Sequence, residues 1–361
     1  MGRLLARVTE RGVLAQVRHV SPVPPRAARG LVGRVYGQLV RDFGMAAPPV
    51  LLHSPAPEVL AAGWMMLRES LLSGGVAARV VKEVVATEVS AANACPYCVD
   101  VHRATLLGLR GHDDPRYAPV AAWARSTGGG RAATEPPPAL DAELVAVAVT
   151  FHYLNRMVAV FLGDSPLPPE VPRRARGPAL RVFGRLMRPA ARRTIPPGES
   201  LPLLPAADLP PDLAWAGSGP LAGAFARASA AIEAAGRRSV PAPVRELVTR
   251  RLAAWDGAPP ARARVTEATA ELPPGLRPAA TLALLTALAP YQVHDATIAA
   301  CRSAQGGGHD DRSLIELTSW ASLSAARRTA EDQPAPLAAG TPSPADTPSP
   351  VKASSVERTN P

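Results

Sequence analysis

The sequence predicts an all-α protein, and two observations lead to this class. Helical periodicity dominates from Pro57 to about Leu162, with a Gly/Pro-rich break at 128–138, and returns from about Leu221 to Ala330. No window shows the sustained alternation of polar and apolar residues that is typical of strands. With 361 residues and 47% hydrophobic content, the chain is long enough and apolar enough to form packed cores.

Composition divides the chain into five predicted segments. The beginning is rich in arginine and carries apolar residues on one helical face, whereas the end alternates proline with serine, threonine and alanine. The region between the two helical blocks is rich in proline and arginine, which predicts a linker with one short basic helix. The predicted segments are a basic N-terminal helical arm (1–44), a first helical domain with a CPYC motif (45–165), a linker (166–220), a second helical domain (221–330) and a disordered tail (331–361).

The net charge of +10 does not by itself predict a nucleic-acid partner. Of the 40 cationic residues only Lys82 and Lys352 are lysines, a bias that is typical of a GC-rich genome. Aromatic residues make up only 4%, so the stacking platforms of single-strand binders are missing. No apolar run reaches the roughly 18 to 20 residues that cross a bilayer, and three cysteines fit a reducing compartment. We therefore expect a cytoplasmic protein with no nucleic-acid and no membrane partner.

The most informative segment runs from Glu83 to His102 and reads EVVATEVSAANACPYCVDVH. Valines at helical spacing predict a helix that carries Glu83 on a face of its own. A break follows, and Pro96 suits the first turn of a new helix because its missing N–H is not needed there. Cys95, Cys98 and His102 then share one face of the second helix. The segment thus assembles two thiols, an imidazole and a carboxylate.

This set of side chains suits thiol redox chemistry. A thiol with a pKa of about 8.5 is mostly protonated near neutrality, and the thiolate is the form that attacks a peroxide or a disulfide. A helix N-terminus favours the negative charge of the thiolate, and a nearby His or Glu can accept its proton. A second thiol can capture the sulfenic acid that a peroxide leaves behind, so that a disulfide forms before further oxidation.

The segment resembles the AhpD-like alkylhydroperoxidases, an all-helical branch of the carboxymuconolactone decarboxylase family. The resemblance covers roughly residues 50–162 and rests on Glu83, Ser90, Asn93, Cys95, Tyr97, Cys98 and His102. It implies that Cys98 is the peroxidatic cysteine, that Cys95 resolves it, and that Glu83 and His102 form a proton relay. It also implies a hydroperoxide substrate, a thiol or lipoyl-protein reductant and no cofactor. Tyr97 stands where characterised relatives can have a second histidine.

Several assignments stay open at this level. The helix-terminus argument favours Cys95 as the thiol of lower pKa, whereas the resemblance favours Cys98. Two inert buried cysteines are a further alternative. A closed zinc site needs four ligands, and no second cysteine pair exists because Cys301 stands alone, so we expect no metal and interpret Cys301 as a core residue. Three residues of the later segment FHYLNRMVAVF are interpreted as structural: His152, Asn155 and Arg156.

The second helical block resembles a degraded copy of the first. APYQV at Ala289 corresponds to CPYCV at Cys95, GHDD occurs at Gly111 and Gly308, and Trp-Ala follows each GHDD at the same distance. The redox side chains are replaced in this copy, with Ala289 for Cys95, Gln292 for Cys98 and Arg277 for Glu83. We infer a duplicated AhpD-like fold whose degenerate second domain is a non-catalytic intrachain partner. The protein is then an intrachain pseudo-dimer or a homo-oligomer.

Three function classes are compatible with these observations. The leading one is a thiol-dependent hydroperoxidase, of peroxiredoxin-type activity, with an antioxidant role. A cofactor-free lyase of the carboxymuconolactone decarboxylase type is the second, although such relatives lack the cysteine pair. The third is a non-catalytic helical scaffold or regulatory protein that has kept the motif.

Overall fold

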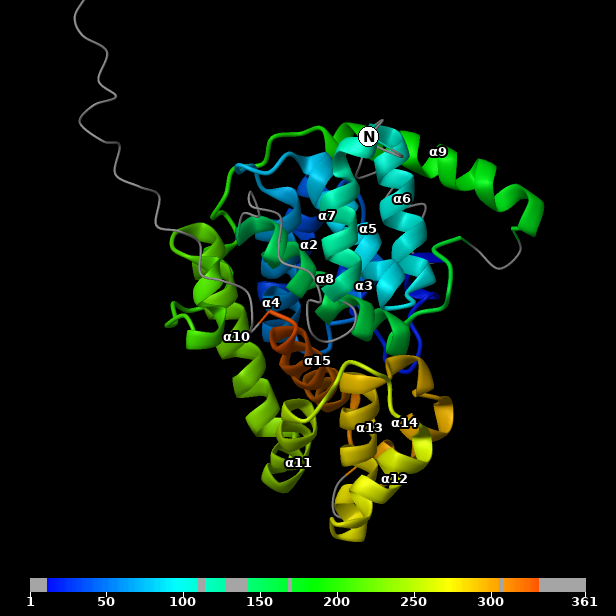
Figure 1. Ribbon diagram of the computed structural model, residues 1–361, viewed down its shortest axis with the longest axis vertical. Helices are drawn as coiled ribbons and strands as arrows, with labels where there is room; N and C mark the ends of the chain where they lie inside the picture. The colour runs from blue at the N-terminus through cyan, green and yellow to red at the C-terminus, as the bar shows by residue number, and fades with distance from the viewer. Residues whose placement is uncertain (1–11, 110–113, 128–141, 168–170, 305–307, 331–361) are drawn as a thin grey trace, which may run out of the picture.

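The structure is a computed structural model and describes residues 12–109, 114–127, 142–167, 171–304 and 308–330. These residues form helices joined by short connections, and none of them lies in a strand (Figure 1). The all-α prediction is confirmed. The predicted Gly/Pro-rich loop, the first three residues of the earlier GHDD and the predicted disordered tail lie outside the described residues.

The helices of the first half surround the cysteine pair. The α-helices are α2 (Gly30–Asp42), α3 (Pro48–Leu51), α4 (Pro57–Leu67), α5 (Arg79–Ala92), α6 (Pro96–Leu109), α7 (Ala118–Ser126) and α8 (Ala142–Phe161). The shorter elements are the 3₁₀ helices η1 (Pro25–Ala27) and η3 (Pro115–Tyr117) and the π-helical segment η2 (Arg68–Leu72). The helices α3, α4 and α6 each begin with proline, because the first helical turn does not use the N–H that proline lacks.

The second half continues with helices of similar length. The α-helices are α9 (Arg173–Ala191), α10 (Pro220–Ser239), α11 (Ala242–Ala253), α12 (Arg262–Ala270), α13 (Arg277–Leu288), α14 (Asp295–Arg302) and α15 (Asp311–Arg328). The 3₁₀ helices are η5 (Leu201–Leu203), η6 (Pro211–Ala216), η7 (Pro274–Leu276) and η8 (Pro290–Gln292). The carboxylate of Asp310 caps α15 by accepting the Ser313 N–H at 2.8 Å.

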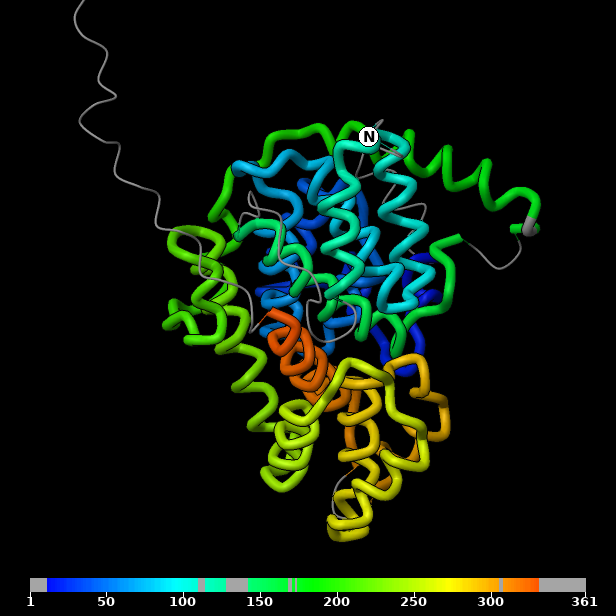
Figure 2. Tube along the Cα trace, viewed as in Figure 1, coloured from blue at the N-terminus to red at the C-terminus, as the bar shows by residue number. Residues whose placement is uncertain are grey.

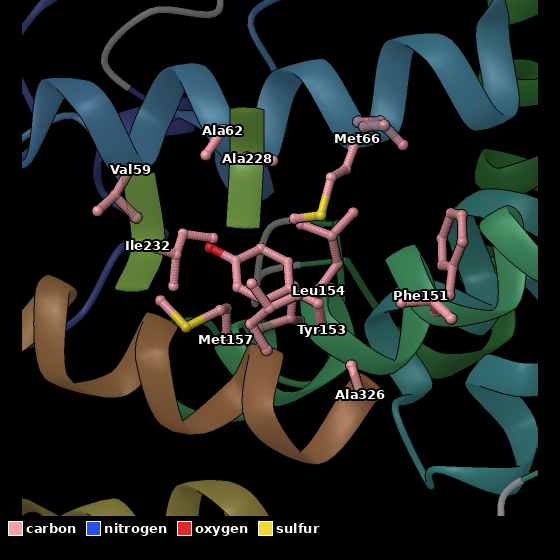
Figure 3. Packing of buried hydrophobic residues seen from close by; sticks show 14 of the residues in the cluster. Val59, Ala62, Met66, Phe151, Tyr153, Leu154, Met157, Ala228, Ile232 and Ala326 are labelled. Carbon is pink, nitrogen blue, oxygen red and sulfur yellow. The ribbon is translucent and has the colours of Figure 1, made fainter. Parts of the chain in front are cut away.

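The helix α8 lies at the centre of the fold. Of its 20 residues, 17 are buried, and it contacts α4, α5 and α15. Figure 3 shows Met66 of α4, Tyr153 and Met157 of α8, Ile232 of α10 and Ala326 of α15 packed together. Within the described residues, α8 alone has the length and apolarity of a membrane-spanning helix, and its position inside the protein accounts for that composition.

The two helical blocks share one hydrophobic core. The helix α10 packs on α4, and α15 packs on α8, so each long helix of the second block contacts the first. Figure 2 shows α12, α13 and α14 gathered at the end of the molecule away from α6 and α9. Buried apolar residues run continuously through both blocks, so the core does not mark where one domain ends and the next begins. The domain boundaries inferred from composition therefore stay predictions.

The predicted linker holds a longer helix than its composition indicated. The helix α9 spans 19 residues despite Pro178 and Pro189, and it lies along α6 (Figure 1). The two helices approach closely at Gly108 and Gly184, where a Cβ atom on Gly184 would meet the carbonyl oxygen of Ala104. Packing against α6 therefore stabilises a helix that its own residues disfavour.

A cluster of charges around the buried Arg68 fastens the chain after α9 to the first block. The fully buried Arg68 guanidinium contacts three carboxylates, with its Nε 2.8 Å from Asp42, its Nη1 2.7 Å from Glu69 and its Nη2 3.1 Å from Glu199. Ser200 also donates its hydroxyl to Glu69 at 2.6 Å. Charges removed from water need such partners, so these bonds select one position for the segment that follows α9.

Substitution of alanine for either of two glycines of α9 tests the close packing. We expect Gly184→Ala to lower the free energy of unfolding by about 1–3 kcal/mol, because the new Cβ forces α6 and α9 apart. Gly177→Ala is the matched control, since the nearest atom to its new Cβ is 3.7 Å away on the Arg181 guanidinium. It should lower the free energy of unfolding by less than Gly184→Ala does in chemical denaturation, because no atom obstructs its Cβ and its cost is only that of a side chain before Pro178. Equal effects of the two changes would contradict the packing argument.

Candidate active site

The turn between α5 and α6 positions the two cysteines. Ala94 has a φ of +50°, and its N–H donates to the Ala91 carbonyl oxygen at 3.1 Å. The Cys95 N–H donates to the Ser90 carbonyl oxygen at 2.9 Å. This pair of bonds is the Schellman arrangement that ends many helices, with alanine here in the left-handed position that glycine usually takes. The chain then enters α6 at Pro96, so Cys95 directly precedes the first turn.

Cys95 and Cys98 lie beside each other at the start of α6. Their Cα atoms are 5.5 Å apart, and their sulfur atoms are at bonding distance, as in a disulfide. Both residues are buried. The arrangement agrees with the spacing argument, because residues three apart on a helix lie on the same side.

His102 follows one turn after Cys98 and is paired with Glu83 of α5. The Nδ1 of His102 lies 2.7 Å from Oε2 of Glu83. The other carboxylate oxygen, Oε1, accepts two bonds from Arg79, at 2.8 Å from Nε and 2.6 Å from Nη2. The His102 ring also meets the ring of Phe151 edge-on, with 4.5 Å between centroids. These contacts fix the orientation of the imidazole.

The charge state of Glu83 follows from its surroundings. Complete burial by itself would raise the pKa of this carboxyl, but the positive charge of Arg79 and the bond to His102 bring the pKa below its ordinary value. A carboxylate can only accept hydrogen bonds, so the His102 proton belongs on Nδ1. The Nε2 of His102 is then free to accept a proton from another group.

An apolar cavity of about 80 Å³ opens beside Cys98. Cys98 and His102 both line it, whereas Cys95 and Glu83 do not. Its walls are mainly hydrophobic and come from seven parts of the chain, among them Val13 before η1, Phe43 after α2, Val101 on α6, Leu154 on α8 and Phe183 on α9. The cavity therefore brings a sulfur atom and a potential proton acceptor together in surroundings that suit an apolar molecule.

Comparison with known proteins agrees with this geometry. The model of the carboxymuconolactone decarboxylase family matches residues 58–135, which include both cysteines, Glu83 and His102. A Mycobacterium tuberculosis protein named alkyl hydroperoxide reductase is 40% identical over 335 residues, covering 86% of this chain and 93% of that protein. The chain belongs to the carboxymuconolactone decarboxylase family. Within it, the cysteine pair and this relative place the chain in the AhpD-like branch, as the sequence predicted. No solved structure matches the chain.

The structure brings together all four site residues that the sequence of this AhpD-like protein singled out. Glu83 and His102 are hydrogen-bonded, and Cys98 adjoins His102 at the cavity, with Cys95 beside it. Their catalytic roles stay predictions. Among the described residues, no group of three or more His, Cys, Asp or Glu side chains is arranged to hold a metal ion.

Asn155 and His152 of α8 hold the turn that carries the cysteines. Asn155 donates to the Ser90 hydroxyl at 3.1 Å and accepts a bond from the Asn93 amide at 2.9 Å. The same amide lies 3.0 Å from Nδ1 of His152, whose Nε2 is 2.9 Å from the Thr127 hydroxyl. Burial, with a smaller contribution from Arg156, lowers the pKa of His152 well below its ordinary value, so its ring is neutral. These contacts agree with the structural interpretation of Asn155 and His152.

Sequence reasoning missed the residues that close the cavity from outside the motif. Val13, Gln16 and Phe183 come from the predicted arm and linker, and they line the same cavity as Cys98. Tyr97 also lines it, and its hydroxyl donates to Gln16 at 3.2 Å. The amphipathic spacing of the arm indicated that it packs on the rest of the protein. It did not show where, because no local pattern records which distant surface a helix will cover.

The predicted second copy repeats the helix arrangement but lacks the redox side chains of the first. The helix α13 contacts α14 and α15 as α5 contacts α6 and α7, which supports the duplication. Ala289 is buried after α13, and the Gln292 amide donates to the Pro260 carbonyl oxygen at 3.0 Å. Arg156 of α8 donates to the Ala287 carbonyl oxygen at 2.9 Å and so caps the C-terminus of α13. The second turn is therefore occupied by packing and caps, with neither thiol nor carboxylate.

The buried pair of Glu83 and His102 predicts a pH-dependent contribution to stability. We expect Glu83→Gln to lower the free energy of unfolding near neutral pH by about 3 kcal/mol, because it leaves Arg79 and His102 without their carboxylate. The folded-state pKa of Glu83 is depressed, so this contribution is complete above the ordinary pKa of 4.5 and disappears as pH falls through the folded-state value.

Denaturation of wild type and variant between neutral and acidic pH measures this difference. The gap between them should narrow below about pH 4.5 and stay constant above it. Glu246→Gln on the exposed face of α11 is the control and should change the free energy of unfolding by less than about 0.5 kcal/mol at every pH. A gap that widens in acid would contradict the assigned charge state.

Proposed function

We propose that this protein is a thiol-dependent peroxidase that reduces organic hydroperoxides. The observation that carries the proposal is the shared cavity. Cys98 and His102 both line this apolar space, and Cys95 lies beside Cys98 but outside the cavity lining. The name of the Mycobacterium tuberculosis relative, alkyl hydroperoxide reductase, supports the same chemistry.

The first step is attack of Cys98 on the peroxide. With the disulfide reduced, the Nε2 of His102 takes the Cys98 proton, and the thiolate attacks the terminal oxygen of the hydroperoxide. The O–O bond breaks, the sulfur is oxidised to a sulfenic acid, and the leaving alkoxide receives the proton from His102 as it becomes an alcohol. Glu83 keeps the Nδ1 proton in place and stabilises the imidazolium that forms between the two transfers.

The second step restores a stable sulfur species. The Cys95 thiol attacks the sulfenic acid of Cys98, a disulfide forms, and water leaves. The described disulfide corresponds to this product. A dithiol reductant, either a small thiol or a lipoylated protein, then supplies two electrons and two protons to regenerate both thiols. The cavity supports Cys98 as the peroxidatic thiol in preference to Cys95, because a substrate in the cavity can meet only the former.

Single cysteine variants test the two roles. In dithiothreitol-dependent consumption of cumene hydroperoxide, we expect Cys98→Ser and Cys95→Ser each to lower turnover by about three orders of magnitude or more, because each removes one reacting thiol. A sulfenic acid should be trapped by dimedone in Cys95→Ser and be absent from Cys98→Ser.

Cys301→Ala is the matched control, since this buried thiol of α14 lies away from the cavity and should not affect turnover. Trapping in Cys98→Ser but not in Cys95→Ser would reverse the assigned roles. Full activity in both variants would contradict the assigned site, whereas absence of hydroperoxide turnover in the wild type would favour the scaffold or the lyase alternative.

The size of the cavity predicts a preference among substrates. Val101 lines the cavity from α6, so Val101→Phe should fill part of it. We expect kcat/KM for cumene hydroperoxide to fall about tenfold while that for hydrogen peroxide changes little, because only the larger substrate needs the lost volume. Leu107→Phe, on the exposed side of the same helix, is the control. Equal losses for both substrates would contradict binding of the substrate in this cavity.

A further inference from the structure

One face of α9 is exposed and combines arginine with aliphatic side chains. Val182 and Leu186 are 50% and 59% exposed, which places them among the five large hydrophobic side chains most exposed in the described chain. The opposite side of the helix packs on α6 through Gly184. At 100° per residue, Arg181, Val182, Arg185 and Leu186 fall within one side of the helix. We call this set of four side chains the α9 face.

The α9 face is strongly positive and has no carboxylate of its own. From Val171 to Gly198 the sequence contains eight arginines and neither aspartate nor glutamate. Arg181 and Arg185 are exposed, and neither forms an ion pair with any residue that the structure describes. Asp100 of α6 acts electrostatically on Arg176, which lies outside the face. The guanidinium groups of the face are therefore available to an external anion.

The order of side chains around α9 is that of an interfacial helix. Arg181 and Arg185 occupy one edge of the face, and Val182 and Leu186 occupy the neighbouring edge about 100° further round. Helices that lie in the surface of a bilayer place aliphatic side chains at the boundary with the acyl chains and basic ones among the lipid phosphates. The N-terminal end of α9, which begins at Arg173, extends beyond the neighbouring helices (Figure 1), and the exposure of Val182 and Leu186 shows that the middle of the helix is also open to solvent on this side.

We propose that the α9 face binds the surface of a membrane that contains anionic lipids. The arginines pair with lipid phosphates, and the aliphatic side chains enter the headgroup region. Sequence composition predicted no membrane partner, and the proposal revises that expectation on the basis of the exposed face. Binding of this kind is peripheral, since the apolar helix α8 stays in the protein core.

Other occupants fit the α9 face less well. A second copy related by twofold symmetry would set the arginines of one α9 against those of the other, at the cost of like-charge repulsion. A nucleic acid would pair with the arginines, but its phosphates would leave Val182 and Leu186 in water. A bilayer surface satisfies both kinds of side chain at once.

The α9 face also lies next to the cavity. Phe183, the neighbour of Val182 on α9, lines the cavity that contains Cys98. Bound to a bilayer through α9, the protein holds this cavity close to the lipid. Lipid hydroperoxides can then reach Cys98 directly from the bilayer. This consequence rests on the proposed peroxidase function, whereas the proposed membrane binding does not depend on it.

Vesicle binding by the full chain tests the proposal. We expect the protein to sediment with vesicles of phosphatidylcholine and phosphatidylglycerol and to bind vesicles of phosphatidylcholine alone much more weakly. The double variants Arg181→Gln/Arg185→Gln and Val182→Ser/Leu186→Ser should each weaken binding about tenfold or more, because each removes one half of the face.

Matched controls separate the face from the net charge. Arg237→Gln/Arg264→Gln removes two exposed arginines elsewhere, and Val76→Ser/Tyr291→Ser removes two other exposed apolar side chains. Both control variants should bind vesicles as the wild type does. Equal weakening by the two arginine pairs would overturn the proposal in favour of diffuse attraction by net charge.

Three further outcomes also count against the α9 face as a membrane site. Absence of binding to the anionic vesicles would overturn the proposal, as would binding that is insensitive to Val182→Ser/Leu186→Ser. Capture of a DNA duplex through Arg181 and Arg185 without vesicle binding would indicate a nucleic-acid partner instead. Consumption of cumene hydroperoxide in the absence of vesicles should be the same in all four variants, so a failure of membrane binding is distinguishable from a failure of the proposed activity.

Discussion

The structure depends on the burial of α8 between the two helical blocks. A helix with 17 of 20 residues buried must find partners for every polar side chain that it carries inward, because an unpaired buried group costs about 1–3 kcal/mol. The Tyr153 hydroxyl lies 2.9 Å from His53 and donates to Ser319 of α15 at 3.2 Å. Asn155 binds the turn after α5, and Arg156 binds the turn after α13. These bonds fix the position of α8 along its axis relative to both helical blocks.

The adjacent residues Asn155 and Arg156 link the two corresponding turns of the duplicated fold. Asn155 supports the turn that carries Cys95, whereas Arg156 caps the helix that precedes Ala289. Burial lowers the pKa of Arg156 to about 10, which still leaves the guanidinium charged at neutral pH. Its partners are backbone carbonyl oxygens and the face of Trp255, 6.0 Å away. A turn that holds an arginine in this way serves packing, and the role of the second copy as an intrachain partner stays a prediction.

The cavity joins the local motif to distant parts of the chain. The α5–α6 turn supplies the sulfur atoms and the imidazole, but the apolar walls include Val13, Phe43 and Phe183. The last of these is held in place by close packing of α9 on α6 at Gly184, and the charges around the buried Arg68 fasten the chain that follows. The reactivity of the thiols is a local property, whereas the choice of substrate depends on tertiary contacts.

By itself the sequence determined the all-helical class, the break that begins α6 at Pro96, and the family, because periodicity, proline and the cysteine spacing are local signals. The pairing of Glu83 with His102 also follows from residues close in the chain. Only the tertiary structure decided that α9 is a long helix, that its Phe183 reaches the cavity, and that α8 carries Asn155 to the cysteine turn. Those contacts join residues far apart in the sequence, and their free energy comes from burying surfaces against each other, which no local pattern records.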